Sequence, residues 1–472
     1  MIHSGLFAAL LSAPSAHAGS IMTAGVTGGP DSGAATPNVA AVMYNPGALG
    51  AVEGVQGMFD LQASFVRLEV TTTRNGGIDP NTGAAWKPAY ASATVPNGIV
   101  GLAWRVIPDR LTLAFAAYDP FVGGGDYSET EKGKVPPYTG HQRYHIIQTT
   151  ILTGALTPAV AVTVLKGVHI GGGVSYVMDS IKVKQNSDPI GSEGVRSDEI
   201  GTGVPAHPYA LDTTLQGDAS GHHWTWNAGI FIDRWKYAQV GASFQAGGTF
   251  QTSGTGSVTV PTDLSSTGEP ITVPALVSVS LPLPPIARLY VNSQVNDKLK
   301  LGAGLDYQMW NVCCGEADGD IAIGLTNTDG GAIGPDNGVA ISISKEQYGP
   351  RRLWNSASIS QLGSYQATPK LWAGWRLMYN QNAVPDYAVS PSNLDFESVG
   401  ASIGGRYLLG KHLELGLAYT KYLLVKREIT TSAWDLRDGN TRFSPELPYK
   451  SSTNGTYQGV VDTVGLRVGA KF

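Results

Sequence analysis

The sequence predicts an all-β protein, a 14-stranded antiparallel transmembrane β-barrel with an N-terminal hatch inside its lumen. Three observations predict it. Apolar and polar residues alternate over about ten residues at a time, as in strands with two different faces. Short and long connections take turns along the chain, as in outer-membrane barrels. No apolar run approaches the roughly 18 residues that indicate a membrane-spanning helix.

The clearest alternation lies in Lys298–Trp310. Its odd positions are Leu, Leu, Ala, Leu, Tyr and Met, and its even positions are Lys, Lys, Gly, Gly, Asp and Gln. Val168–Asp179 shows the same period, and His412–Leu423 and Val460–Phe472 follow it with one exception each. Because successive side chains of a strand point to opposite faces, each segment predicts a strand with one apolar and one polar face. A soluble β-sandwich shows this pattern too, so the connections must decide between the two.

The connections between the predicted strands fall into two classes that alternate. In a sandwich no rule would keep short and long links alternating, whereas outer-membrane barrels have short turns on one side and long loops on the other. The short links are Pro108–Arg110, Lys166–Gly167, Asp233–Lys236, Asn296–Asp297 and Gly410–Lys411. The long links are Thr71–Pro96, Val122–Gly140, Gln185–Asp212, Thr252–Pro270, Cys313–Gly338, Gln381–Asp395 and Thr431–Thr456.

The number of predicted strands can be checked against the even number that a single-chain bacterial barrel has. Clear strands cover 57–70, 97–106, 111–121, 141–165, 168–184, 213–232, 237–251, 271–295, 298–311, 370–380, 396–409, 412–428 and 457–472. These are thirteen, and a single-chain bacterial barrel has an even number. The segment between Cys313 and Lys370 must therefore hold one more, which we place within Val339–Leu362.

Composition narrows the function further. Glycine makes up 60 of 472 residues, about twice its usual share. Gly171, Gly173, Gly302 and Gly304 fall on polar faces, which suits an inner wall against which something bulky packs. The net charge is -5 and its 32 basic residues are scattered, so no nucleic-acid partner is expected.

The first residues resemble an export signal. A short apolar stretch precedes Ala16-His17-Ala18, which has the form of a cleavage site, so residues 1–18 are predicted to be a signal peptide. The signal is atypical, because its first four residues carry no Lys or Arg. The only cysteines are the neighbours Cys313 and Cys314, which form neither a disulfide framework nor a metal site. We expect no cofactor and no metal.

The next segment, residues 19–54, does not alternate and is rich in Gly and Ala. A segment of this length cannot form a core of its own, but its small residues can fill a barrel interior. We therefore divide the mature chain into a hatch, or plug, at 19–54 and a barrel at 55–472. A disordered periplasmic tail is the alternative.

Ala40–Leu49 reads AAVMYNPGAL and resembles the hatch motif of the FadL/TodX family of long-chain fatty acid and hydrocarbon transporters. Asn45, Pro46 and Gly47 match the family's Asn-Pro-Ala, with Gly in place of the equally small Ala. The resemblance covers essentially all of 19–472, although the long loops match poorly. Further similar segments are Tyr118–Gly123, Arg143-Tyr144, Leu156–Ala161, Leu413–Lys426 and Gly455–Tyr457.

The resemblance implies a multi-pass outer-membrane transporter that takes up hydrophobic small molecules passively. We expect a monomer, because a plugged barrel has no need to form a trimer. In this family the cargo leaves sideways into membrane lipid at a kinked third strand, here in or near Leu111–Phe121. By the same resemblance Gly19, Ser20, Ile21 and Met22 are candidates to touch the cargo, and Asn45, Pro46 and Gly47 hold the hatch. A fatty-acid carboxylate would need a lumen cation, for which Arg467, Lys298 and Lys300 are candidates, although all three lie near the short turns.

Three other functions stay open. A general porin for polar solutes is the first, but it should lack a hatch and carry more charge. An outer-membrane enzyme is the second. An adhesin or structural barrel is the third. The acidic and histidine residues of the loop-rich regions show no spacing that would pair a nucleophile with a base; they are Asp126, Glu129, His141, His145, His222 and His223.

Overall fold

The computed structural model describes residues 32–73, 77, 84–127, 140–143, 145–187, 212–262, 265–314, 321–339, 346–349, 351–432, 434–435, 442–443 and 453–472. The predicted signal peptide and the candidate residues Gly19, Ser20, Ile21 and Met22 lie outside these ranges. No helix in the described part of the chain has both the length and the apolar composition needed to cross a membrane.

Nearly all strands belong to one 19-stranded sheet. The strands are β1 (Val55–Thr72), β2 (Ala89–Ile107), β3 (Leu111–Tyr118), β4 (Val122–Asp126), β5 (Gln148–Leu165), β6 (Val168–Ser187), β7 (Thr213–Trp235), β8 (Ala238–Gln245), β9 (Gly248–Val260), β10 (Ile271–Leu283), β11 (Ile286–Gln294), β12 (Leu299–Gln308), β13 (Ile321–Asn327), β14 (Glu346–Gly349), β15 (Ser356–Thr368), β16 (Leu371–Asn380), β17 (Ser398–Leu409), β18 (Leu413–Ile429) and β21 (Gly455–Lys471). A separate pair is formed by β19 (Trp434–Asp435) and β20 (Arg442–Phe443). The short helices are α2 (Ala41–Tyr44), η2 (Pro46–Ala51), α3 (Trp310–Cys314), η7 (Pro335–Asn337) and η8 (Asp386–Ala388).

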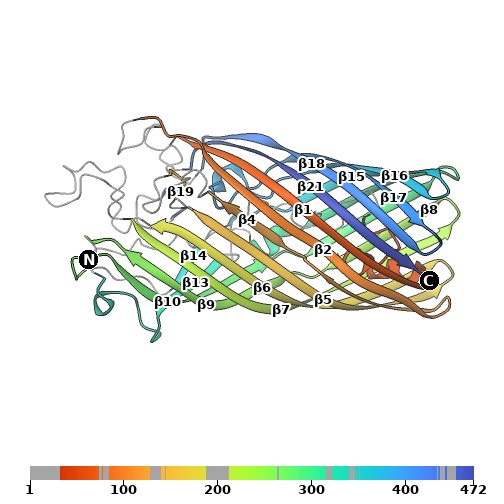
Figure 1. Ribbon diagram of the computed structural model, residues 1–472, viewed down its shortest axis with the longest axis horizontal. Helices are drawn as coiled ribbons and strands as arrows, with labels where there is room; N and C mark the ends of the chain where they lie inside the picture. Colours follow the sequence, from red (N-terminus) through yellow and green to blue (C-terminus); the bar gives the residue numbers. More distant parts are fainter. Residues whose placement is uncertain are drawn as a thin grey trace.

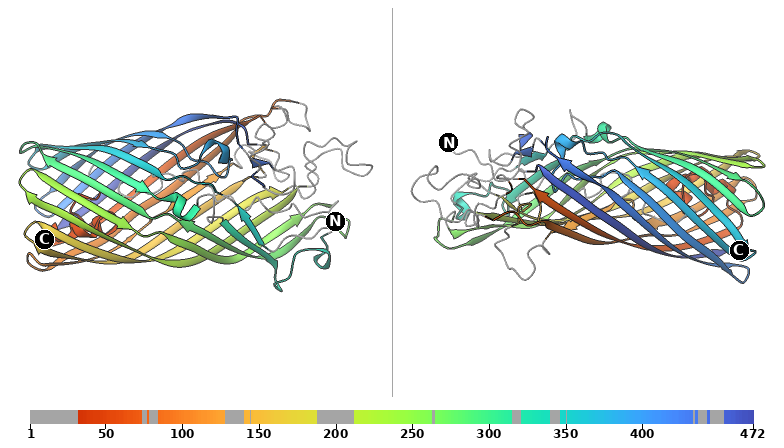
Figure 2. Two further views of the ribbon diagram at one scale, coloured as in Figure 1. Left: turned by 180° about the vertical axis from the view of Figure 1, so that it is seen from behind. Right: turned by 90° about the horizontal axis from the view of Figure 1, so that it is seen from above.

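The large sheet closes into a barrel, because the last strand, β21, pairs with the first, β1. Five positions around the barrel hold two consecutive segments instead of one continuous strand: β3/β4, β8/β9, β10/β11, β12/β13 and β14/β15. The 19 strands thus occupy 14 positions, and all their pairings are antiparallel. Figures 1 and 2 show the resulting cylinder with its strongly tilted strands. The predicted fold class is confirmed.

The fourteenth strand exists, but it is longer than predicted. β15 begins within the expected Val339–Leu362 and continues to Thr368, with the short β14 before it. Its inward positions Ser356, Ser358 and Ser360 are buried serines, so they give no apolar signal to the alternation. The requirement for an even number of strands thus predicted a strand whose ends the hydrophobic pattern does not reveal.

Several long links are shorter than predicted, because the strands on either side continue beyond the apolar band. β2 already begins at Ala89, β9 continues to Val260, and the supposed loop after Cys313 contains β13. Conversely, the strand predicted from 141 begins only at Gln148. Beyond the band the outward positions become polar, as at Lys182 on β6, and such stretches look like loops in the sequence.

The barrel carries apolar side chains on its outer surface and polar side chains inside, the reverse of a soluble protein. On β1, Phe59, Leu61 and Phe65 point outward and are 45%, 49% and 42% exposed, whereas the intervening Asp60 and Gln62 are buried in the lumen. An outward apolar band and a polar interior are typical of a barrel that spans a membrane. The exposed apolar side chains are stabilised by transfer to hydrocarbon, which replaces water at their surface.

Candidate functional site: the lumen and a gap in its wall

The N-terminal segment, defined here as residues 32–54, lies inside the barrel near the end that carries the short turns and the C-terminus (Figures 1 and 2). Its two short helices, α2 and η2, are joined at Asn45. Asn45 has extended dihedrals and its Oδ1 accepts a hydrogen bond from Gly47 N at 3.0 Å, while Pro46 occupies the first helical position. Pro there loses no hydrogen bond, so the Asn-Pro pair starts η2 efficiently.

The same Asn45 side chain ties the segment together and to the wall. Its Nδ2 donates to Ala34 O at 2.7 Å and to Ile230 O of β7 at 3.0 Å. Asn45 is fully buried, so these bonds satisfy backbone carbonyls that no water reaches. The predicted motif residues Asn45, Pro46 and Gly47 therefore lie together at the contact between the segment and β6–β7.

Wall glycines let the main chain of the segment approach. A Cβ added at Gly171 would stand 2.4 Å from Pro46 O, one at Gly229 2.0 Å from Asn45 Oδ1, and one at Gly241 1.9 Å from Ala34 O. At contacts below 3.0 Å the glycine or its neighbour must shift. At Gly47 itself a Cβ would lie 2.7 Å from Gly229 O, so the family's usual Ala does not fit here without movement.

Polar wall side chains complete the attachment, and four of them donate to backbone carbonyls of the segment. Asn227 Nδ2 donates to Val42 O at 2.8 Å, and Ser243 Oγ donates to Tyr44 O at 2.5 Å. Asn292 Nδ2 donates to Ala35 O at 2.9 Å, and Arg105 donates to Gly50 O at 3.0 Å. The segment is thus held by specific hydrogen bonds as well as by apolar packing.

Replacement of Asn45 by Ala should loosen the N-terminal segment without unfolding the barrel. The variant loses three hydrogen bonds and leaves buried carbonyls unpaired, a cost of about 1–3 kcal/mol per unsatisfied group. We expect backbone amides of 32–52 to exchange with solvent at least about tenfold faster, measured by hydrogen exchange and mass spectrometry. Asn38→Ala is the control, because Asn38 only caps Ala40 N locally at 2.9 Å. Equal exchange in both variants would contradict the anchoring role.

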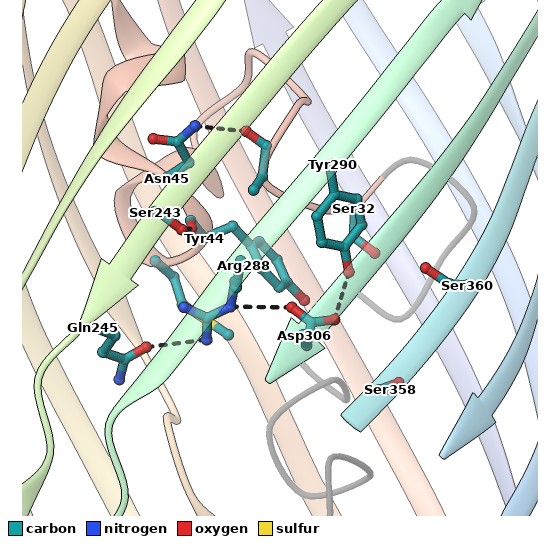
Figure 3. Close-up of polar contacts among 12 residues, drawn as sticks. Ser32, Tyr44, Asn45, Ser243, Gln245, Arg288, Tyr290, Asp306, Ser358 and Ser360 are labelled. Atoms are coloured by element: carbon teal, nitrogen blue, oxygen red, sulfur yellow. Dashed lines mark hydrogen bonds and ion pairs between the residues drawn. The ribbon is translucent and has the colours of Figure 1, made fainter. Parts of the chain in front are cut away.

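A charged cluster, shown in Figure 3, lies beside the segment in the lumen. Asp306 of β12 accepts a hydrogen bond from Tyr290 OH at 2.6 Å and lies 3.4 Å from Arg288 Nε. Arg376 of β16 donates to Tyr290 OH at 2.8 Å and to Ser32 Oγ at 2.9 Å, and lies 3.9 Å from Asp306. The cluster therefore joins three wall strands to the start of the described N-terminal segment.

The cluster carries more positive than negative charge. Two guanidinium groups, on Arg288 and Arg376, share the single carboxylate of Asp306, and the two arginines are only 4% and 1% exposed. Arg288 Nη1 and Arg376 Nε are buried without a hydrogen-bond acceptor among the described residues. Asp306 Oδ1 is likewise buried without a donor among the described residues. A buried donor without a partner is costly, so a further acceptor beside the two guanidinium groups would stabilise the cluster.

The cations named from the sequence have other positions. Arg467 is neutralised by Asp60 at 2.7 Å, and Lys300 donates to Gln239 at 2.9 Å near the short turns. Arg288 and Arg376 were missed, although each occupies an inward position of an alternating strand. A search for Arg on the polar face of strands, as in Trp372-x-Gly374-x-Arg376, would have found them.

The third strand is interrupted. β3 ends at Tyr118 and β4 begins at Val122, and three residues there oppose two on β5, because Tyr118 pairs with Ala155 and Val122 with Leu152. On the other side, β2 pairs with β3 up to Ile99 and meets β4 only at Ser92. Residues 93–98 of β2 and 119–125 thus face each other outside the strand ladder, which leaves a gap in the strand pairing of the barrel wall.

Side chains satisfy the backbone at the rim of this gap. Thr153 Oγ1 accepts from Phe121 N at 2.8 Å and donates to Phe121 O at 2.5 Å. Asp119 Oδ2 accepts from Gly98 N at 3.1 Å, and Asp119 N donates to Gly98 O at 3.3 Å. These contacts replace ladder bonds at a depth where unsatisfied groups would be expensive.

The gap opens within the outward apolar band. On one side of it, β2 pairs with β1 at the level of Leu61 and Phe65, which are both exposed on the outer surface. On the other side, Leu152 and Leu156 of β5 are 43% and 37% exposed on the same surface. The interruption of strand pairing therefore lies at the level of the outward apolar band.

Apolar residues line the inside of the barrel from the long-loop end to the gap. One buried cluster contains inward residues of β10 and β13, such as Val277, Val279 and Leu325, and it also contains Phe121 at the gap. Tyr118, on the other flank of the gap, belongs to the cluster formed with Met43 of the N-terminal segment. The two flanks of the interrupted strand thus belong to two apolar clusters inside the barrel, and apolar surroundings suit an apolar molecule better than a polar one.

Comparison with known proteins agrees with this architecture. Residues 9–468 match the family described as outer membrane protein transport protein (OMPP1/FadL/TodX). Comparison with individual curated proteins gave no match. A Pseudomonas aeruginosa FadL homologue superposes with a TM-score of 0.72 at 17% identity, over 96% of this chain and 98% of that one.

Two toluene transporters are also similar in structure. TodX of P. putida has a TM-score of 0.63 at 14% identity and covers 92% of this chain and 94% of its own. TbuX of Ralstonia pickettii has a TM-score of 0.58 at 15% identity and covers 94% and 96%. At these identities the likeness shows the fold, while the family match extends over nearly the whole sequence. The chain is therefore a member of the FadL/TodX family of outer-membrane transport proteins.

Proposed function

We propose that this outer-membrane protein takes up hydrophobic small molecules passively and releases them sideways through the gap between β2 and β4. The observation that carries the proposal is the gap itself, which opens inside the apolar band and is flanked by apolar lumen residues. Cargo that enters among the long loops meets the apolar surface first and reaches the gap along it.

The energetics favour a sideways exit. A buried methylene group is worth about 0.8 kcal/mol, so a 16-carbon chain loses on the order of 10 kcal/mol when it enters water. A path along the barrel axis into the periplasm would require that transfer. The gap lets the chain pass from one apolar environment to another, so the cargo needs no energy source beyond its gradient.

We also propose that residues 19–54 act as the hatch, with Gly19–Met22 touching the cargo. The proposal is supported by the buried position of residues 32–52 and by their hydrogen bonds to wall strands β7, β8 and β11. Ser32, bonded to Arg376, places the start of the described N-terminal segment at the charged cluster. Movement of the hatch would then change the hydrogen bond between Ser32 and Arg376.

The charged cluster favours a cargo with a carboxylate, such as a long-chain fatty acid, over a neutral hydrocarbon. A carboxylate placed between Arg288 and Arg376 would balance the extra positive charge and accept from their free N–H groups. A hydrocarbon would leave both donors unsatisfied, which costs free energy.

Arg288→Gln should separate the two cargo classes. We expect the palmitate concentration at half-maximal uptake by proteoliposomes to rise about tenfold, because one charge-assisted contact to the carboxylate is lost. Uptake of hexadecane, which has the same chain length, should change less than about twofold, since methylene burial is unaltered. Both are measured with radiolabelled cargo at neutral pH.

The matched control is Arg467→Gln, which removes another inward, buried arginine that Asp60 neutralises one to one. It should leave the preference for palmitate intact. Parallel losses for palmitate and hexadecane in Arg288→Gln would refute the carboxylate site but not transport. Wild-type protein that moves neither compound would refute the transport proposal.

We propose no catalytic role and a monomeric state. His222 points outward beside Tyr176, at a ring-centroid distance of 5.3 Å, in the aromatic rim of the apolar band. His223 is held by Asp179 of the neighbouring strand at 2.7 Å. These are structural positions of a barrel wall, and the filled lumen also argues against a general porin.

A further inference from the structure

The N-terminal segment is seated off-centre in the barrel. It contacts the wall at β6, β7, β8 and β11, where glycines and polar side chains receive its backbone. At the short-turn end a cavity lies between residues 36–38 of the segment and the wall strands β12, β15, β16, β17 and β21. The cavity has a volume of about 510 Å³. Because the short turns of such barrels face the periplasm, the cavity opens to that side.

The lining of this cavity, which we call the basal cavity, is polar. The N-terminal segment contributes Thr36, Pro37 and Asn38. The wall contributes four cations and one acidic residue: Lys298, Lys300, Arg406, Lys471 and Asp297. In a chain with a net charge of -5, four cations around one cavity are a strong local concentration of positive charge. Apolar cargo gains nothing from such a lining.

Two of these cations are held in place by the wall. Lys300 Nζ donates to Gln239 Oε1 at 2.9 Å. The Arg406 guanidinium lies 5.6 Å from the centre of the Trp372 ring and 3.3 Å from Glu414 Oε2. Lys298 and Lys471 are exposed at the mouth of the cavity. With Asp297 and Glu414 both counted, the cations still exceed the carboxylates by two.

We propose that the basal cavity binds a phosphate-bearing anion from the periplasm. A cavity lined by one sign of charge concentrates counter-ions, and phosphate carries up to two negative charges and accepts from several donors at once. A carboxylate would match only half of the excess charge. The anion would lie between the N-terminal segment, at Thr36–Asn38, and the wall strands. This site is distinct from the cargo path and does not depend on which cargo is carried.

The test is calorimetric titration of the purified full-length protein with inorganic phosphate, in neutral detergent at constant ionic strength. Wild-type protein should bind phosphate saturably. The double variant Lys298→Gln/Lys471→Gln should bind at least about tenfold more weakly, because it removes two of the charged donors. The control Lys182→Gln/Lys426→Gln removes two exposed lysines that pair with Asp218 and Glu428, and its affinity should stay within about twofold of wild type.

A second arm separates a soluble anion from a lipid head group. Short-chain phosphatidylglycerol is titrated into the same detergent solution. Saturable phosphate binding that the cavity variant loses supports the proposal. Absence of saturable phosphate binding by wild type, binding of phosphatidylglycerol alone, or equal weakening in both double variants would overturn it. Heat-modified migration on gels confirms that each variant retains the folded barrel.

Discussion

Deletion of residues 19–54 is expected to convert the protein into an ion-conducting pore that no longer takes up hydrophobic cargo. Residues 32–52 lie in the lumen next to β6–β8. The wall itself is held together by backbone hydrogen bonds between neighbouring strands, which do not involve the segment. The barrel should therefore still fold. Without the segment, water fills the lumen, and single-channel conductance in planar bilayers should rise by roughly an order of magnitude or more.

Uptake should be lost in the same variant, because a water-filled lumen opposes the movement of an apolar chain. A milder pair of variants tests the same point. Gly241→Ala places a Cβ against Ala34 O, whereas Gly469→Ala adds one at an inward position whose nearest neighbour, the Glu414 side chain, is 3.6 Å away. Only the first should raise conductance. If the deletion leaves both conductance and uptake unchanged, the hatch role of 19–54 is wrong.

Deletion of Pro120 should close the gap in the wall and abolish uptake without opening a pore. Three residues after Tyr118 oppose two on β5, so removal of one restores an even register. The straightened third strand could then pair with residues 93–98 of β2, and each restored backbone hydrogen bond contributes about 1 kcal/mol. Palmitate uptake should fall by at least about tenfold, while conductance stays at the wild-type level.

The matched control removes Ala367, the extra residue of a bulge between β15 and β16 near a short turn. That bulge borders no gap, so its deletion should leave uptake close to wild type. Hydrogen exchange supplies an independent readout, because closure should protect amides of 93–97 that have no strand partner on the third-strand side. Full uptake in a variant with newly protected amides would exclude this gap as the exit.

The architecture was accessible from the sequence because membrane spanning forces a period of two on nearly every strand. Lys298–Trp310 illustrates this, since its Leu residues face lipid and its Gly and Asp residues face the lumen. Parity supplied the remaining strand, β15, whose inward serines conceal its pattern. The Asn-Pro motif likewise located the contact between the N-terminal segment and the wall.

The gap and the charged cluster were not accessible in the same way. Asp119-Pro120 indicates a turn, but only the register against β5 and β2 reveals that strand pairing is interrupted there. Arg288, Asp306 and Arg376 lie on three different strands, and no local pattern shows that they meet. Their proximity depends on the stagger of the closed barrel, a global property that no single segment encodes.

The hydrogen bonds of Thr153 and Asp119 at the interrupted third strand have a consequence for regulation. Because they satisfy backbone groups at the interruption, the interruption is part of the folded structure, and the exit that we propose there would need no trigger to form. Under that proposal, the rate of uptake would be set upstream, by how quickly a molecule enters the lumen. Mutations at the proposed exit and mutations that change entry into the lumen should accordingly act on separate kinetic steps. Selection could then adjust one step without changing the other.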